Sequence, residues 1–475
     1  MIKLRDRYPV IIDIVTWIIR IFLGALFIFS GMTKGIDVWG TFYKFREYFG
    51  ALGFEVWDAL NLVGVFVLCL LEFLTGIFLL LGCFRRATPI IAALIMAFML
   101  PLTLWLAIAE PIKDCGCFGE AITLTNWQTF WKNVVICVGV VWLLFYNRFA
   151  TCIITPYLQW IGAVVSGLYF LTISIIGYYY QPLIDFRPYP VGSTLVNLND
   201  ETGEDSEDEY LIFVYEKDGQ KKEFTIDDEI PDEADGWTFV EQKTKEPEYV
   251  DEEAPVKPVK EETEKNIRFY SEDGHEDLTH EIIGEGKQLI LMIPTLSEVP
   301  AARTWKINSF YQWAQANDIN MLATVGGNPK EIEQWKDIAL PEYEIYTSDD
   351  TSIEEVVRGN PAVVYLEDGV IKWKSSLRAI DIEDFQNPEV NSDPMSFAHN
   401  DRLILMNITW VYLAVMLVLI VLSFSAKGLR FIFRKAKPTE EKNEESTERA
   451  SSEEKVSESI KEEEEKSTET KEKDE

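Results

Sequence analysis

The chain has 475 residues, of which 48% are apolar, and it carries a formal net charge of −33. The negative charge is concentrated in two segments, residues 200–265 with a net charge of −17 and residues 438–475 with a net charge of −9. Acidity of this kind belongs to solvated linkers and tails, and it argues against a nucleic-acid partner. The apolar residues instead gather in blocks of about 20, a length that crosses a hydrocarbon core of roughly 30 Å.

Six such blocks predict six membrane-spanning helices. The first block follows Lys3, Arg5 and Arg7 and lacks a small-residue cleavage pattern, so we expect an uncleaved span rather than a signal peptide. The blocks are residues 10–31, 60–82, 89–109, 129–146, 157–180 and 403–423.

Lysine and arginine in short loops predict the orientation of these spans, because they favour the cytoplasmic side. The predicted inner segments carry Lys3, Arg5, Arg7, Arg85, Arg86, Arg148, Lys427, Arg430, Arg434, Lys435 and Lys437. Both termini are then cytoplasmic, and residues 181–402 lie in the periplasm of a bacterial inner-membrane protein. Membrane lipid is an expected partner.

Two of the six cysteines, Cys115 and Cys117, are close neighbours, separated only by Gly116. Glycine lets the backbone fold tightly enough for such a pair to close a small, strained ring, and a strained disulfide exchanges readily. The predicted topology places the pair on the oxidising side of the membrane. Lys113 favours a thiolate in this loop and the neighbouring carboxylates oppose it, so the sequence leaves the charge state of the pair open.

Two charged residues lie within predicted spans. Arg20 is about ten residues into the first span and Glu72 about ten residues from the inner end of the second, which predicts matching depth and a contact between them. A buried charge needs a partner, so each should face the interior of the bundle. The pair either forms a proton, quinone or substrate site or fixes the register of the helices.

The soluble part, residues 186–400, alternates strands and helices as expected for a small α/β sandwich. A hairpin is predicted around Asp218-Gly219, followed by a linker over residues 244–265. The predicted strands thereafter are residues 267–270, 288–293, 320–325, 343–346, 362–366 and 370–374, and the predicted helices are residues 301–317, 329–339 and 352–358. Residues 438–475 predict a disordered acidic tail. Of the three histidines, only His275 and His280 are near each other, five residues apart in a predicted turn. We expect them to be an exposed pair, so no metal site is predicted.

Three motifs together resemble a known family. The segment Arg20-Ile-Phe-Leu-Gly-Ala-Leu-Phe-Ile-Phe-Ser-Gly-Met-Thr-Lys34 and the segment Glu72-Phe-Leu-Thr-Gly-Ile-Phe-Leu-Leu-Leu-Gly82 resemble the DoxX superfamily of four-helix membrane proteins. The segment Cys115-Gly-Cys-Phe-Gly119 narrows the resemblance to its MauE-like branch. The resemblance covers roughly residues 10–150. It implies Cys115 and Cys117 as a redox pair, Arg20 and Glu72 as the polar centre of the bundle, and a quinone as cofactor.

The soluble domain resembles thioredoxin-like proteins of the TlpA type. The strand at residues 288–293 should lead into a Cys-x-x-Cys motif, and Asn360-Pro361-Ala362 stands in the place of the cis-proline loop. This sequence departs from the pattern, because residues 153–475 contain no cysteine. The domain therefore cannot exchange dithiols by itself; it either binds an extended polypeptide beside Pro361 or docks on the membrane domain.

The expected domains follow from these observations. They are a DoxX/MauE-like four-helix membrane domain (1–150), a fifth transmembrane helix (151–185), an acidic β-containing segment and linker (186–265), a degenerate thioredoxin-like domain (266–400), a sixth transmembrane helix (401–437) and an acidic tail (438–475). The expected function is redox maturation of periplasmic client proteins through Cys115 and Cys117. The alternative is a non-enzymatic assembly or peptide-binding factor in which the cysteine pair is structural.

Overall fold

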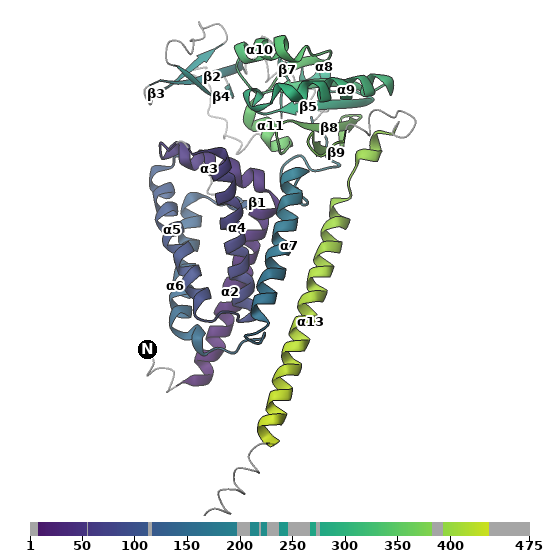
Figure 1. The fold of residues 1–475 in the computed structure, drawn as a ribbon. Coiled ribbons are helices and arrows are strands. Elements are labelled where there is room, and N and C mark those ends of the chain that lie inside the picture. Colours follow the sequence, from purple (N-terminus) through teal and green to yellow (C-terminus); the bar gives the residue numbers. More distant parts are fainter. Residues whose placement is uncertain are drawn as a thin grey trace, which may run out of the picture.

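The computed structural model describes residues 8–54, 56–112, 116–196, 210–217, 220–225, 237–245, 267–271, 276–381 and 393–436. Within them, six helices are long and apolar enough to cross a membrane, which confirms the prediction of a multi-pass membrane protein. They are α2 (Pro9–Ile36), α4 (Asp58–Leu81), α5 (Ala87–Ala109), α6 (Asn126–Tyr146), α7 (Gln159–Tyr179) and α13 (Asp401–Ala436). In Figure 1 the first five stand side by side as a bundle, while α13 runs along the outside next to α7.

The sixth span is attached to the bundle by aromatic and hydroxyl contacts. The ring of Tyr412 stacks on Tyr169 with centroids 4.2 Å apart, and its hydroxyl lies 3.0 Å from Ser166 Oγ. A hydroxyl pair of this kind satisfies polar groups that the hydrocarbon core cannot hydrate.

A short helix, α3 (Val38–Ala51), covers the end of the bundle that faces the soluble part (Figure 1). The sequence predicted a loop here because the segment is neither long nor apolar enough to span. Asp37 caps the helix, since its Oδ1 accepts a hydrogen bond of 2.9 Å from the backbone of Gly40.

The soluble part begins with a small antiparallel sheet of order β3-β2-β4. Strands β2 (Tyr210–Lys217) and β3 (Gln220–Thr225) confirm the predicted hairpin, although Asp218-Gly219 lies outside the described residues. The third strand, β4 (Thr238–Lys245), was not predicted, because only its first residues are apolar. It forms because β2 supplies a full row of antiparallel partners.

A five-stranded mixed sheet follows, with the order β7-β6-β5-β8-β9. The strands are β5 (Lys287–Ile293), β6 (Asn320–Val325), β7 (Glu344–Thr347), β8 (Ala362–Glu367) and β9 (Val370–Ser376). The first three are parallel and β8 and β9 are antiparallel, with β9 entered through the predicted turn at Asp368-Gly369, where both φ angles are positive.

Helices cover both faces of this sheet, as the predicted alternation requires. The longer helices are α9 (Thr304–Ala316), α10 (Pro329–Ala339) and α11 (Asp350–Val356), and the short ones are α8 (Thr279–Ile282), η3 (Leu296–Glu298), η4 (Ala301–Arg303) and η5 (Pro394–Phe397). Alternate residues of β5 enter two separate cores, so that the central strand is buried on both faces.

Two segments differ from their predicted roles in this sheet. Residues 267–270 do not form a strand; only Tyr270 makes isolated bridges, to Asp277 and Thr347. Conversely, residues 189–196 pack into the sheet, where Thr194 bridges Val370 of β9.

The close contact between α2 and α4 depends on glycine. A Cβ atom added to Gly76 of α4 would lie 2.6 Å from the backbone nitrogen of Ile28 in α2, whereas one added to Gly64 of the same helix would meet nothing within 4 Å. Glycine at such positions lets two backbones approach closely.

We therefore expect Gly76→Ala to lower the thermal unfolding midpoint of the detergent-solubilised protein. Alanine normally raises helix stability by about 1 kcal/mol relative to glycine, so Gly64→Ala should leave the midpoint unchanged or higher. Equal midpoints for the two variants would contradict this packing.

Candidate functional site: the cysteine loop between two buried ion pairs

The cysteine loop leads into β1 (Cys117–Glu120), a short strand laid against α2. Residues 113–115 lie outside the described residues, so the predicted pairing of Cys115 with Cys117 stays a prediction. Cys117 is half-buried and packs in a cluster with Tyr48 of α3 and Leu106 of α5. Gly116 has a φ of +57°, which the turn before the strand requires.

A hydrogen-bonded group beneath the loop connects Cys117 to a buried ion pair. Ser30 Oγ lies 2.9 Å from the carbonyl oxygen of Cys117 and 2.9 Å from Oε2 of Glu72. The Nζ atom of Lys34 lies 2.8 Å and 2.7 Å from the two carboxylate oxygens of Glu72. Both charged side chains are only 4% exposed, so each needs the other.

Ser30 cannot satisfy both acceptors with separate protons. Its single hydroxyl donates a hydrogen bond either to the carbonyl oxygen of Cys117 or to an ionised Glu72. Alternatively, a protonated Glu72 donates a hydrogen bond to the hydroxyl oxygen of Ser30. The hydroxyl of Ser30 therefore links the carboxylate of Glu72 to the backbone of the loop. Lys34 also interacts electrostatically with Cys117.

The predicted pair of Arg20 and Glu72 is wrong. Arg20 donates from Nε to the carbonyl of Leu79 at 3.0 Å and from Nη1 to that of Thr151 at 3.1 Å, near the opposite end of the bundle. The prediction counted depth from the ends of the apolar blocks. Arg20 is in fact level with Leu79, so the inner ends of α2 and α4 do not lie at the same depth and Glu72 faces Ser30 instead.

A second buried ion pair lies above the loop and joins it to the soluble domain. The guanidinium of Arg358, 2% exposed, donates from Nε and Nη2 to Asp37 at 2.9–3.0 Å, and Nη2 also contacts Glu120. Burial opposes the ionisation of Asp37, but Arg358 outweighs it and holds the pKa of Asp37 below its ordinary value. Glu120 is the last residue of β1, so Arg358 restrains the loop directly.

The segment that enters the soluble domain fixes Arg358 from its other side. Gln181 donates from Nε2 to the carbonyl of Arg358 at 2.7 Å and accepts from its backbone nitrogen at 3.0 Å. Lys374 of β9 donates to Asp185 at 2.5 Å, and Arg187 donates to the same carboxylate at 2.6 Å. Two cations on one carboxylate overcome the cost of burial and lower the pKa of Asp185 to about 2.

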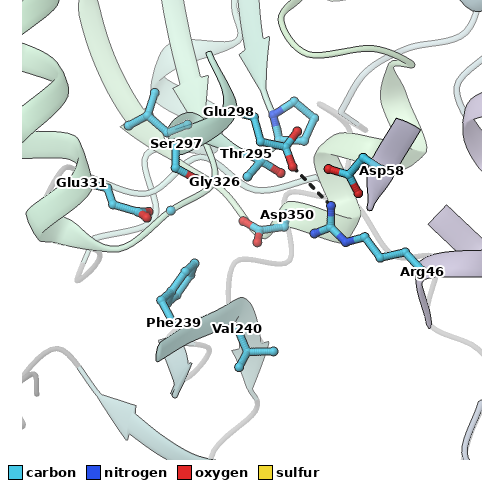
Figure 2. Close-up of a pocket in the computed structure, with 13 residues that line it drawn as sticks. Arg46, Asp58, Phe239, Val240, Thr295, Ser297, Glu298, Gly326, Glu331 and Asp350 are labelled. Atoms are coloured by element: carbon cyan, nitrogen blue, oxygen red, sulfur yellow. Dashed lines mark hydrogen bonds and ion pairs between the residues drawn. The ribbon is translucent and has the colours of Figure 1, made fainter. Parts of the chain in front are cut away.

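A cleft of about 310 Å³ lies where the soluble domain meets α3, at the carboxyl ends of β5 and β6. Figure 2 shows the carboxylate of Asp350 directed into it, with the ion pair of Arg46 and Glu298 (3.4 Å) across its mouth. Burial, reinforced by nearby Asp349, raises the pKa of Asp350 well above its ordinary value. The cleft occupies the edge of a parallel sheet where ligands of α/β proteins commonly bind.

Pro361 lies next to this cleft but is itself buried. Its carbonyl accepts a hydrogen bond from Leu377, and the preceding Asn360 is joined to it by a cis peptide bond. Asn360 Nδ2 donates to the carbonyl of Thr295 in the wall of the cleft at 2.6 Å. A peptide-binding role for Pro361 stays a prediction.

Sequence reasoning missed most of the polar residues around the loop. Ser30 and Lys34 lie in the motif that carries the family resemblance, four residues apart and so on one helix face, which was the available signal. Asp37, Glu120 and Arg358 carried no local signal, because their contact joins positions more than 200 residues apart.

We expect Lys34→Met to destabilise the protein by roughly 3 kcal/mol, because it leaves Glu72 as an unpaired buried charge. Thermal unfolding in detergent measures this effect, and Lys34→Met combined with Glu72→Gln should recover much of the loss. Lys44→Met breaks a partly exposed pair with Glu47 and should cost less than about 1 kcal/mol. A loss in Lys34→Met no larger than that of Lys44→Met would contradict the assignment.

We expect Arg358→Gln to loosen the soluble domain from the bundle, because Asp37 loses its buried partner. Hydrogen exchange should rise in both α11 and β1, whereas Arg268→Gln, which breaks a more exposed pair with Asp277, should change neither. The contribution of Asp37 to stability is present above its unfolded pKa of about 4 and is lost as the pH falls through its lower folded pKa. Unchanged exchange in β1 would show that Arg358 does not restrain the loop.

Comparison with known proteins agrees with the membrane part of this description. Residues 12–146 match the family model described as "Methylamine utilisation protein MauE", and residues 211–246 match one described as "Domain of unknown function (DUF8463)". No curated protein and no solved structure matches the chain. The first match runs from α2 to the end of α6 and includes Ser30, Lys34, Glu72 and Cys117; it supports a MauE-like membrane protein.

Proposed function

We propose that this protein is a thiol–disulfide oxidoreductase of the bacterial inner membrane that acts on periplasmic client proteins through Cys115 and Cys117. The observation that carries the proposal is the bridge from the carbonyl of Cys117 through Ser30 to the ion pair of Glu72 and Lys34. Buried charges are costly, and a functional loop is a reason for placing them directly beneath it.

The proposed step is an exchange between a client dithiol and a disulfide formed by Cys115 and Cys117. A client thiolate attacks one sulfur of the pair and gives a mixed disulfide, which the second client thiolate then resolves. The client loses two electrons and two protons as its disulfide forms, and the pair becomes a dithiol. Lys34 stabilises a thiolate at Cys117. Glu72 and Ser30 hold Lys34 and the backbone of the loop in position for this role.

The soluble domain is proposed to be thioredoxin-like, and to hold the client rather than react with it. The strand order and the mixed parallel and antiparallel pairing support the proposed fold. The absence of cysteine after Cys152 supports a domain that holds the client without reacting with it. The cleft of Figure 2 is a suitable place for the client, since Arg46 lines it while Tyr48 of the same helix packs beside Cys117.

A membrane quinone is the proposed acceptor of the two electrons, on the strength of the family resemblance alone. The cleft of Figure 2 is not lined by Cys117 or by another residue of β1. The exchange step with the client requires no quinone.

The distribution of lysine and arginine supports the proposed periplasmic location of the loop. Arg85, Arg86 and Arg148 lie at the bundle end opposite the soluble domain, and a cytoplasmic position for that end places the loop outside.

The exchange can be tested in a variant in which Cys69, Cys83, Cys137 and Cys152 are replaced by serine. Mixed with a reduced synthetic peptide containing two cysteines, the oxidised protein should form one peptide disulfide per chain and become a dithiol, as read by alkylation and mass. Cys115→Ser or Cys117→Ser, mixed instead with the oxidised peptide, should trap a mixed disulfide, because its single loop thiolate opens the peptide disulfide and the loop has no second thiol to resolve the product. Lys34→Met should slow alkylation of Cys117 near neutral pH.

The matched control is Cys137→Ser in the otherwise native chain, which should exchange at the native rate. If neither single loop variant traps the peptide and the native pair stays in one redox state throughout, the exchange function is wrong.

The alternative is an assembly factor in which the cysteine pair is structural, and the cysteine-free soluble domain is the observation that favours it. That alternative predicts full function in cells after both loop cysteines are replaced by serine. The oxidoreductase predicts complete loss in the same variant.

A further inference from the structure

The end of the bundle remote from the soluble domain carries a second cavity, of about 640 Å³. It is lined by Phe84, Arg85, Arg86, Ala87, Arg148 and Phe149. These residues come from the turn between α4 and α5 and from η1 (Asn147–Phe149), which follows α6. The volume is in the range of small-ligand sites.

Hydrogen bonds between the two turns hold the walls of this cavity together. Arg85 Nη1 donates to the carbonyl of Ala150 at 2.7 Å, and Asn147 Nδ2 donates to the carbonyl of Arg85 at 2.9 Å. The ring of Phe84 is fixed by edge-on contacts with Phe78 and Trp160, with centroids 5.1 Å and 5.2 Å away. The cavity is therefore part of the fold and not a chance opening between mobile side chains.

The charge of the cavity is entirely positive among the described residues. Three arginines line it and no acidic side chain does. Helix α5 begins at Ala87 in the same lining and has no side-chain cap, so the positive end of its dipole adds to the arginines. Arg86 and Arg148 are exposed, which leaves their guanidinium groups accessible to a ligand.

The position and composition of the cavity identify the ligand. It lies at the ends of three apolar spans, α4, α5 and α6, at the depth where lipid headgroups meet the hydrocarbon core. Guanidinium groups bind phosphate oxygens through paired hydrogen bonds, and the two phenyl rings supply apolar surface for the part of a lipid below its phosphate. We infer that this cavity binds the phosphate group of an anionic phospholipid.

The test compares lipid binding by the native chain with that of Arg86→Gln/Arg148→Gln, which keeps Arg85 and its hydrogen bond. Native mass spectrometry of the detergent-solubilised protein, titrated with phosphatidylglycerol or phosphatidylcholine, measures both affinities. The native chain should bind phosphatidylglycerol at least about tenfold more tightly. The double variant should lose roughly 10- to 30-fold in affinity for phosphatidylglycerol and little for phosphatidylcholine.

Two further variants distinguish the cavity from general charge effects. Lys287→Gln/Arg402→Gln removes the same charge from exposed positions outside the cavity and should bind both lipids like the native chain. Arg86→Lys/Arg148→Lys should keep the preference for phosphatidylglycerol. A thermal unfolding midpoint equal to that of the native chain would show that this variant remains folded.

Equal affinity of the native chain for the two lipids would overturn the inference. So would displacement of phosphatidylglycerol by inorganic phosphate at equal concentration, because the site would then take free phosphate rather than lipid. No displacement by phosphate supports a lipid ligand.

Discussion

The ion pair between Arg358 and Asp37 is the contact on which the arrangement of the two halves depends. Asp37 ends the first span and caps α3, and Arg358 follows α11 of the soluble domain. Either charge would be strongly destabilising if it were buried here without the other, so the ion pair favours one position of the soluble domain on the bundle. Because Arg358 also contacts Glu120, the same position of the soluble domain determines where β1 and the adjoining cysteine loop lie.

The loop is therefore held between two buried ion pairs of different kinds. The lower pair, Lys34 with Glu72, depends on the register of α2 and α4, which the contacts at Gly31 and Gly76 fix. The upper pair depends on the fold of a domain encoded more than 200 residues later. Ser30 connects the lower pair to the carbonyl of Cys117, and Glu120, at the other end of β1, connects the upper pair to the same strand.

The sequence predicted the elements better than the contacts between them. The six spans and the five strands of the larger sheet have strong apolar patterns, so their positions agree closely with the structure. Strand β4 was missed because its pairing with β2 outweighs a weak local pattern. The depth of Glu72 was predicted wrongly because the first two apolar blocks were assumed to have their inner ends at the same depth in the membrane. Ser30 and Arg20 are ten residues apart, about 15 Å along the helix, and this distance separates Glu72 from the partner predicted for it.

In the proposed function, the absence of cysteine from the soluble domain separates binding from chemistry within one chain. Arg358 contacts the loop strand, and Asn360, two residues later, contacts Thr295 in the wall of the cleft. Residues 358–360 are buried and hydrogen-bonded on both sides, so they cannot adjust independently. This short segment is thus a direct mechanical connection between the cleft and the cysteine loop. A domain that retained its own dithiol would need no such connection, whereas one that only holds a client has to present it to a loop in the membrane domain.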